Sequence, residues 1–205
     1  VEVPMGITLR DVIFKIGGGI RGGKKFKAVQ TGGPSGGFIP EQYLDLPVDF
    51  DELTKVGSMM GSGGMIVMDE DTCIVDVTRY YVDFLFQESC GKCVPCREGL
   101  KQAREILNRI CEGKGTMEDL ETLQDLSELL RNASLCALGT TAANPIMTSI
   151  EYFRSEYEAH ILEKRCPAKV CKALIAYYIN PEKCQACGVC LRNCPVKAIS
   201  GEKNI

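Results

Sequence analysis

The sequence predicts an α+β protein in which a small glycine-rich region is followed by four long helices and a short cysteine-rich segment. Short apolar runs separated by glycine-rich turns occupy roughly the first third of the 205 residues. From residue 71 the apolar residues recur at spacings of three and four, as on one face of a helix. After His160 the sequence becomes basic and rich in cysteine. The predicted domains are 1–70, 71–163, a linker at 164–180 and a terminal segment at 181–205.

The composition is that of a folded protein that uses cysteine for something other than disulfides. The chain has 12 Cys, 1 His and a net charge of −3 from 24 basic and 27 acidic residues. A chain of this length buries roughly 70% of its unfolded surface and needs no disulfide scaffold, and its cysteine spacings are typical of metal sites. We therefore expect a reducing compartment, the cytoplasm. The mixed charges argue against nucleic acid as a partner, and we expect neither a membrane span nor an export signal.

The first region is predicted to contain one short helix and three strands. Thr8 can cap a helix that stops at Gly17. The glycine runs at 17–23 and 32–37 lack the strand and helix context of a phosphate-binding loop, so we interpret them as turns. Apolar runs between these turns are expected to form strands at residues 26–30, 38–39 and 65–68.

Four helices are predicted between residues 71 and 163. Thr116 and Asp119 form the pattern of a capping box at the third helix, and Asn144 caps the fourth ahead of Pro145. Short connections predict an up-down-up-down bundle, in which the first and third interhelical loops lie at the same end. The second helix is expected to begin beside Arg97, and the helices are expected to end near Ser89, Cys111, Arg131 and His160.

The strongest local motif is a run of four cysteines, Cys184, Cys187, Cys190 and Cys194, with proline after the last. Three thiolates at two-residue gaps suit a [4Fe-4S] cluster, as in bacterial ferredoxins, whereas zinc sites usually take cysteine in separated pairs. In two-cluster ferredoxins the fourth cysteine binds the other cluster. Either a second run follows the last residue and Cys194 serves another cluster, or Cys194 completes the cluster held by the other three. We favour the first alternative.

A second set has Cys90, Cys93 and Cys96 at two-residue gaps, with Cys136 in a later loop. The predicted topology brings the two loops to the same end of the bundle, so the four thiolates are expected to hold a first [4Fe-4S] cluster. The second helix begins here, and its N-terminal dipole would favour the anionic cluster. A zinc site with four thiolate ligands is the alternative.

A third set consists of Cys111, His160, Cys166 and Cys171. The second and fourth helices end at the same end of the predicted bundle, opposite the first cluster. Three thiolates and one imidazole are a typical shell for structural zinc, and here they would form a hinge in the linker. The alternative is that His160 is a helix-end cation and the thiols are merely reduced. Cys73 is interpreted as a small buried hydrophobic residue.

Several motifs together resemble the NADH-binding flavoprotein subunit of complex I. They are ESCGKCVPCREG at 88–99, SLCALG at 134–139 and YFRSEYEAH at 152–160. GSGG at 61–64 and DEDTC at 69–73 are similar to the end of that family's β-grasp soluble-ligand-binding domain. The segment from Cys166 to Cys194 resembles instead the β subunit of NAD(P)-linked, electron-bifurcating iron hydrogenases and related formate dehydrogenases.

The resemblance implies a β-grasp domain at 1–70, a four-helix iron-sulfur bundle, and a partial ferredoxin-like domain. It implies the electron-transfer portion of a multisubunit NAD(P)H-dependent oxidoreductase. FMN and NAD(H) are expected only in a part N-terminal to this chain, because no residue matches the family's flavin loop; the chain alone should not oxidise NADH. Expected partners are other iron-sulfur subunits, including a thioredoxin-like one, and a catalytic hydrogenase subunit. The competing hypothesis is a zinc-stabilised interaction module without redox chemistry.

Overall fold

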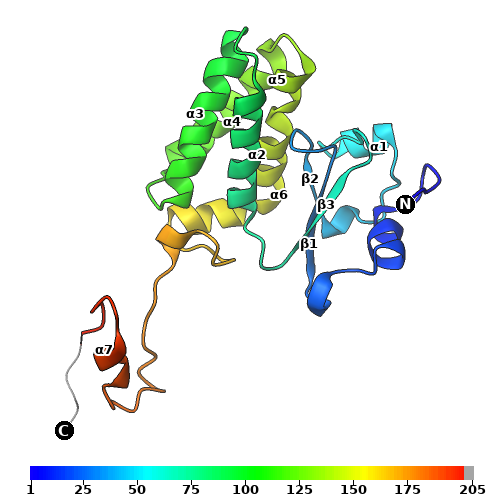
Figure 1. The fold of residues 1–205 in the computed structure, drawn as a ribbon. Helices are drawn as coiled ribbons and strands as arrows, with labels where there is room; N and C mark the ends of the chain where they lie inside the picture. Colours follow the sequence, from blue (N-terminus) through cyan, green and yellow to red (C-terminus); the bar gives the residue numbers. More distant parts are fainter. Residues whose placement is uncertain (201–205) are drawn as a thin grey trace. The chain divides into compact units, whose positions relative to one another are not determined.

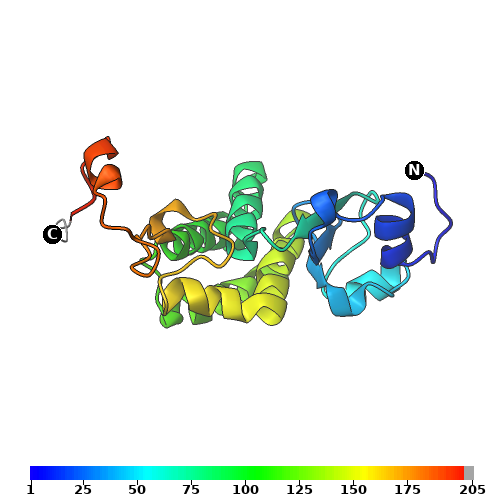
Figure 2. The ribbon, with the colours of Figure 1, turned by 90° about the horizontal axis from the view of Figure 1, so that it is seen from below.

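The protein combines a small antiparallel sheet with a larger group of helices (Figures 1 and 2). The computed structural model describes residues 1–200; residues 201–205, the end of the predicted terminal segment, lie outside the described part. The chain divides into a first compact unit, Val1–Ile175, and a second that begins at Ala176. Within residues 1–200, no helix is both long enough and apolar enough to cross a membrane.

The sheet has three strands in the order β2-β1-β3, and both pairings are antiparallel. The strands are β1 (Phe26–Thr31), β2 (Phe38–Pro40) and β3 (Met65–Asp69), at the predicted positions. The turn between β1 and β2 depends on a glycine, because a Cβ on Gly36 would lie 1.6 Å from the Thr31 carbonyl oxygen. Position 36 of this turn therefore accepts only glycine, the residue without a side chain.

Two short helices flank the sheet, and one of them was not expected. The predicted helix after Thr8 is a π-helical segment, η1 (Asp11–Ile16), and the Thr8 hydroxyl accepts from the Asp11 N–H at 3.1 Å. The unexpected helix is α1 (Phe50–Lys55), where the Asp49 carboxylate accepts from the Asp51 N–H at 2.9 Å. The first unit also contains three 3-10 segments: η2 (Arg21–Gly23), η3 (Glu41–Tyr43) and η4 (Lys172–Leu174).

Four long helices and one short one form the helical region, defined here as residues 74–161. The predicted capping box is present: the Thr116 hydroxyl accepts from the Asp119 N–H at 3.2 Å, and the Asp119 carboxylate accepts from the Thr116 N–H at 3.0 Å. The helices are α2 (Ile74–Glu88), α3 (Val94–Cys111), α4 (Met117–Ala133), the short α5 (Ala137–Thr141) and α6 (Ala143–Ile161).

Helix boundaries differ from the prediction at two places. Helix α3 begins at Val94, ahead of Arg97, because Pro95 is tolerated in a first turn, where an N–H needs no helical partner. Asn144 does not cap α6; its side-chain amide donates instead to the Ser35 carbonyl at 3.1 Å. Helix α6 also bends at Phe153 (φ −131°, ψ 30°), so that its second half passes the start of α2 (Figure 1).

The sheet and the helices share a buried core within the first unit. It joins Phe38 of β2 and Met68 of β3 to Ile74 and Tyr81 of α2. A buried hydrogen bond crosses the same boundary, because the Phe38 N–H donates to the Thr148 hydroxyl of α6 at 2.9 Å. The sheet is therefore attached to the helical region by side-chain packing and by a specific polar contact.

Thr148→Val should lower the free energy of unfolding by about 1–3 kcal/mol, because it leaves the buried Phe38 N–H without an acceptor at nearly constant volume. Thermal unfolding can measure the loss, at roughly 2–4 °C per kcal/mol for a chain of this size. Thr122→Val is the matched control, since the exposed Thr122 hydroxyl donates only to the Glu118 carbonyl within its own helix. Equal Tm values for the two variants would contradict the role given to this contact.

Candidate metal centres

The first cysteine set lies where α2, α3 and α5 meet. Cys90 is exposed in the loop after α2, Cys93 is the N-cap of α3, and Cys96 is buried in the first turn of that helix. Cys136 is exposed and is the N-cap of α5. Burial raises the pKa of the Cys96 thiol, and the other three thiols also raise it because they lie nearby. The structure therefore brings the four predicted residues together.

Hydrogen-bond donors surround these sulfur atoms. The backbone N–H groups of Leu135 and Cys96 lower the pKa of the Cys93 thiol. The Ser89 hydroxyl lies 3.2 Å from the Cys96 sulfur. Donors directed at thiolates stabilise negative charge, which is what an anionic iron-sulfur cluster requires of its surroundings. The donor set and its environment fit such a cluster.

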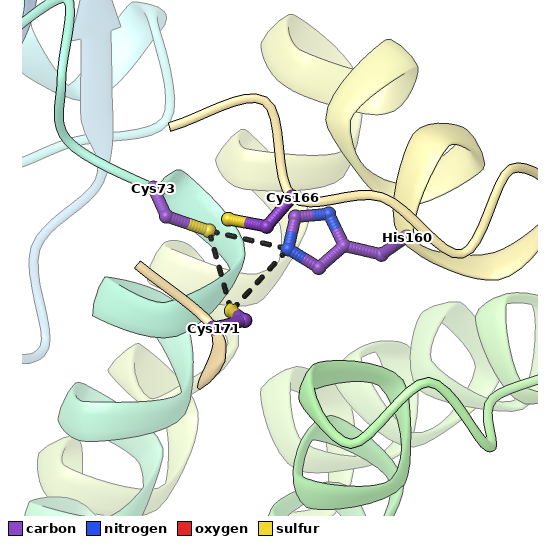
Figure 3. A group of neighbouring side chains, drawn as sticks. All are labelled: Cys73, His160, Cys166 and Cys171. Atoms are coloured by element: carbon purple, nitrogen blue, oxygen red, sulfur yellow. Dashed lines mark hydrogen bonds between the residues drawn. The ribbon is translucent and has the colours of Figure 1, made fainter. Parts of the chain in front are cut away.

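A second centre is formed at the opposite end of α3 by four buried side chains: Cys73, His160, Cys166 and Cys171 (Figure 3). Their ligand atoms all lie within 4.8 Å of one another. The His160 Nε2 atom is 3.4 Å from both the Cys73 and the Cys171 sulfur, and those two sulfurs are 3.9 Å apart. Three thiols and one imidazole nitrogen thus face a common point.

These distances match a tetrahedral metal shell. With zinc–sulfur bonds of about 2.3 Å and zinc–nitrogen bonds of about 2.0–2.1 Å, the edges of a tetrahedron are roughly 3.8 Å between two sulfurs and 3.5 Å between sulfur and nitrogen. Contact with Cys171 and burial both raise the pKa of the Cys73 thiol, so this thiol stays protonated unless a cation ionises it. The residues present fit zinc.

The fourth member of this centre differs from the predicted set. Cys111 is not among the four; its sulfur belongs to an adjacent group with Cys171 and Asp76. Cys73, interpreted from the sequence as a small buried hydrophobic residue, takes its place. It immediately precedes α2, and in the predicted topology the start of the first helix lies at the same end as the C-termini of the second and fourth. That signal was in the sequence and could have identified Cys73.

Contacts with Glu156 position His160 and the backbone beside Cys73. The His160 Nδ1 atom is 2.6 Å from the Glu156 carbonyl oxygen one turn earlier in α6, which leaves Nε2 facing the sulfurs. The Glu156 carboxylate accepts from the Ile74 N–H, next to Cys73, at 3.1 Å. Its other oxygen is 2.6 Å from the Lys27 ammonium group of β1. One carboxylate therefore links the sheet, the start of α2 and the histidine-bearing helix.

The second unit carries the remaining four cysteines around the short helix α7 (Val189–Asn193). Cys184, Cys187 and Cys190 are exposed, and Cys194 is half-buried. The Cys194 sulfur accepts from the Ala198 N–H at 3.3 Å, and this and neighbouring backbone N–H groups lower the pKa of the thiol. Cys194 is thus already in a setting that favours a thiolate.

Comparison with known proteins defines the class of protein. Residues 76–160 match the family described as the NADH-ubiquinone oxidoreductase-F iron-sulfur binding region, and residues 177–200 match the 4Fe-4S binding domain. The helical region therefore belongs to that iron-sulfur family, and the resemblance inferred from the cysteine motifs is confirmed.

Individual relatives make the similarity more specific. The chain is 56% identical over 203 residues to the NADP-reducing hydrogenase subunit HndC of Solidesulfovibrio fructosivorans, covering 99% of this chain and 41% of that protein. It is 46% identical over 166 residues to an NADH-quinone oxidoreductase F 2 chain of Rhizobium meliloti, covering 81% of this chain and 39% of the relative. The chain thus spans well under half of both relatives.

A solved structure agrees with these matches. The crystal structure of an NAD+-reducing [NiFe]-hydrogenase in the H2-reduced state superposes with a TM-score of 0.69 at 32% sequence identity. The similarity covers 78% of this chain and 26% of the hydrogenase chain. The arrangement of sheet and helices is therefore similar to that of one part of this hydrogenase chain.

Proposed function

We propose that this chain is the electron-transfer portion of a multisubunit NAD(P)H-dependent oxidoreductase of the bifurcating hydrogenase type. The observation that carries the proposal is the presence of two distinct iron-sulfur domains in one chain, each with a close triple of cysteines. The similarity to the hydrogenase subunit extends over 203 residues, whereas that to the quinone oxidoreductase chain extends over 166. The longer match favours a hydrogenase-type parent.

Each iron-sulfur site has its own proposed ligand set. Bound [4Fe-4S] clusters accept and donate one electron at a time. Cys90, Cys93, Cys96 and Cys136 would ligate one cluster in the helical region, where backbone N–H groups stabilise the ionised sulfurs. The ligands proposed in the second unit are Cys184, Cys187 and Cys190, with Cys194 serving either this cluster or another one.

A structural zinc ion is proposed at Cys73, His160, Cys166 and Cys171. The burial of all four side chains and the separation of their ligand atoms, all within 4.8 Å of one another, support it. A closed shell of four protein ligands leaves no position for water or substrate, so the ion would have no catalytic role. It would fasten the segment that follows α6 to the start of α2.

The rest of the proposal concerns the architecture of this chain, the parent protein and its location. We propose that the sheet region has a β-grasp architecture and that the four long helices form a bundle. FMN and NAD(H) would bind elsewhere in the parent, which accords with the nicotinamide cofactors in the names of the relatives. Other iron-sulfur subunits, a thioredoxin-like one included, and a catalytic hydrogenase subunit would be its partners. The twelve cysteines, all within residues 1–200, form no disulfide, which supports a cytoplasmic location.

Anaerobic purification tests the proposed function against a zinc-only interaction module. The protein should be brown, and dithionite should bleach its visible absorbance. Cys187→Ala should lose the cluster of the second unit, about four iron atoms per chain, and keep that of the helical region. Iron analysis and EPR measure both effects. A colourless wild-type protein, replete with zinc and free of iron after anaerobic reconstitution, would favour the non-redox module.

A further inference from the structure

The Ser134 hydroxyl is buried beside the first cysteine set and has no hydrogen-bond partner in the described part of the chain. Ser134 is the C-cap of α4 and lies two residues before Cys136. Buried hydroxyl groups are nearly always paired, and an unpaired one usually indicates a partner that the protein atoms do not supply. The missing hydrogen-bond partner of the Ser134 hydroxyl is therefore expected at the cluster site.

Gly139 shows that the fold keeps this hydroxyl close to Cys96. A Cβ on Gly139 would lie 2.5 Å from the Ser134 Oγ atom and 3.3 Å from the Cys96 Cβ atom. The φ angle of Gly139 is not positive, so glycine is needed there for space and not for its backbone conformation. Any side chain at this position would push Ser134 or Cys96 aside.

Ser134 is distinct from the other hydroxyl at this site. The Ser89 hydroxyl already contacts the Cys96 sulfur at 3.2 Å and accepts from the Gly91 N–H at 3.3 Å. Ser89 thus has protein partners, whereas Ser134 has none in residues 1–200. Both hydroxyls lie near Cys96, and the Ser134 hydroxyl is the one without a partner in residues 1–200, so its proton is available to a group outside the polypeptide.

We propose that Ser134 donates a hydrogen bond to a sulfur atom of the cluster held by Cys90, Cys93, Cys96 and Cys136, and that this bond raises the cluster's reduction potential. The inference rests on the proposed cluster. Reduction adds one negative charge, and a donor to a cluster sulfur stabilises the more negative state; hydrogen bonds to the sulfurs are among the factors that set cluster potentials. Ser134 would then tune the potential without ligating iron.

A redox titration followed by EPR tests this role in anaerobically reconstituted protein. Ser134→Ala should keep the iron content and lower the reduced-to-oxidised ratio at a fixed potential about tenfold, which is 59 mV for one electron. Ser134→Thr, which keeps the hydroxyl, should stay near the wild type. Ser127→Ala is the matched control, because the buried Ser127 hydroxyl is already engaged with the Leu123 carbonyl at 2.7 Å.

An unchanged potential in Ser134→Ala, or an equal shift in Ser127→Ala, would overturn the proposal. If Ser134→Ala loses its cluster, Ser134→Val decides the matter, since valine fills the same space as the threonine of Ser134→Thr but has no hydroxyl to donate. Its potential should fall, and a wild-type potential in that variant would refute the bond. A wild-type protein without iron at this site would instead refute the proposed function, so the two failures are distinguishable.

Discussion

Replacement of Cys136 by alanine should remove the first cluster and reduce the iron content by about four atoms per chain. The physical reason is that Cys136 is the single member of the proposed ligand set outside the run from Cys90 to Cys96, and it is the N-cap of a different helix. Without it the three remaining thiolates leave one iron without a protein ligand. Iron analysis and the EPR signal of the dithionite-reduced protein measure the loss.

Leu135→Ala provides the matched control for that experiment. Leu135 is adjacent to Cys136 and is 83% exposed, so the substitution alters the same loop without removing a sulfur atom. It should keep both the iron content and the EPR signal. A Cys136→Ala protein with the iron count and spectrum of the wild type would show that the proposed ligand set is wrong.

Cys73→Ser and His160→Ala should each lose about one zinc ion per chain, whereas Cys111→Ser should retain it. Cys73 and His160 would supply two of the four ligands in the proposed closed shell, and serine is a poor substitute for thiolate with this metal. Cys111 lies next to Cys171 but outside the group of four. Zinc analysis by mass spectrometry after dialysis against a chelator measures the difference.

The same three variants discriminate between the two proposed zinc sets. If Cys111→Ser loses zinc and Cys73→Ser keeps it, the set predicted from the sequence is correct and the spatial one is wrong. Retention of zinc by His160→Ala would reject both. Thermal unfolding is a second readout, because metal that binds only the folded state stabilises it, and Tm should fall only in the variants that lose the ion.

Local sequence was enough to predict the parts that depend on neighbouring residues. The capping box at Thr116 and the end of α3 at Cys111 lie where the pattern placed them, since each involves contacts within one or two turns. The convergence of Cys136 on the Cys90 loop followed from the order of the helices. The unexpected α1 had a local signal too, in the capping carboxylate of Asp49.

Elements without a local signal could not be placed in advance. The bend of α6 at Phe153 lies in a helix whose apolar spacing is continuous, so the pattern does not predict it. Asn144 looks like a helix cap in the sequence. Its side-chain amide instead donates a hydrogen bond to the carbonyl of Ser35, which is 109 residues away along the chain. A contact between the sheet and the helices overrode the local preference in that case.

From the sequence alone came the cysteine runs at close spacing, the cofactors that such runs suit, and the family that the motifs resemble. The fold was needed to show which candidate ligands from distant parts of the sequence lie together. Cys73 and His160 are 87 residues apart in the sequence and 3.4 Å apart in space. The spacing of cysteines within a run predicts only the geometry of one loop or one helical turn. A contact such as that between Cys73 and His160 depends on how whole helices pack against one another, which is a property of the complete fold.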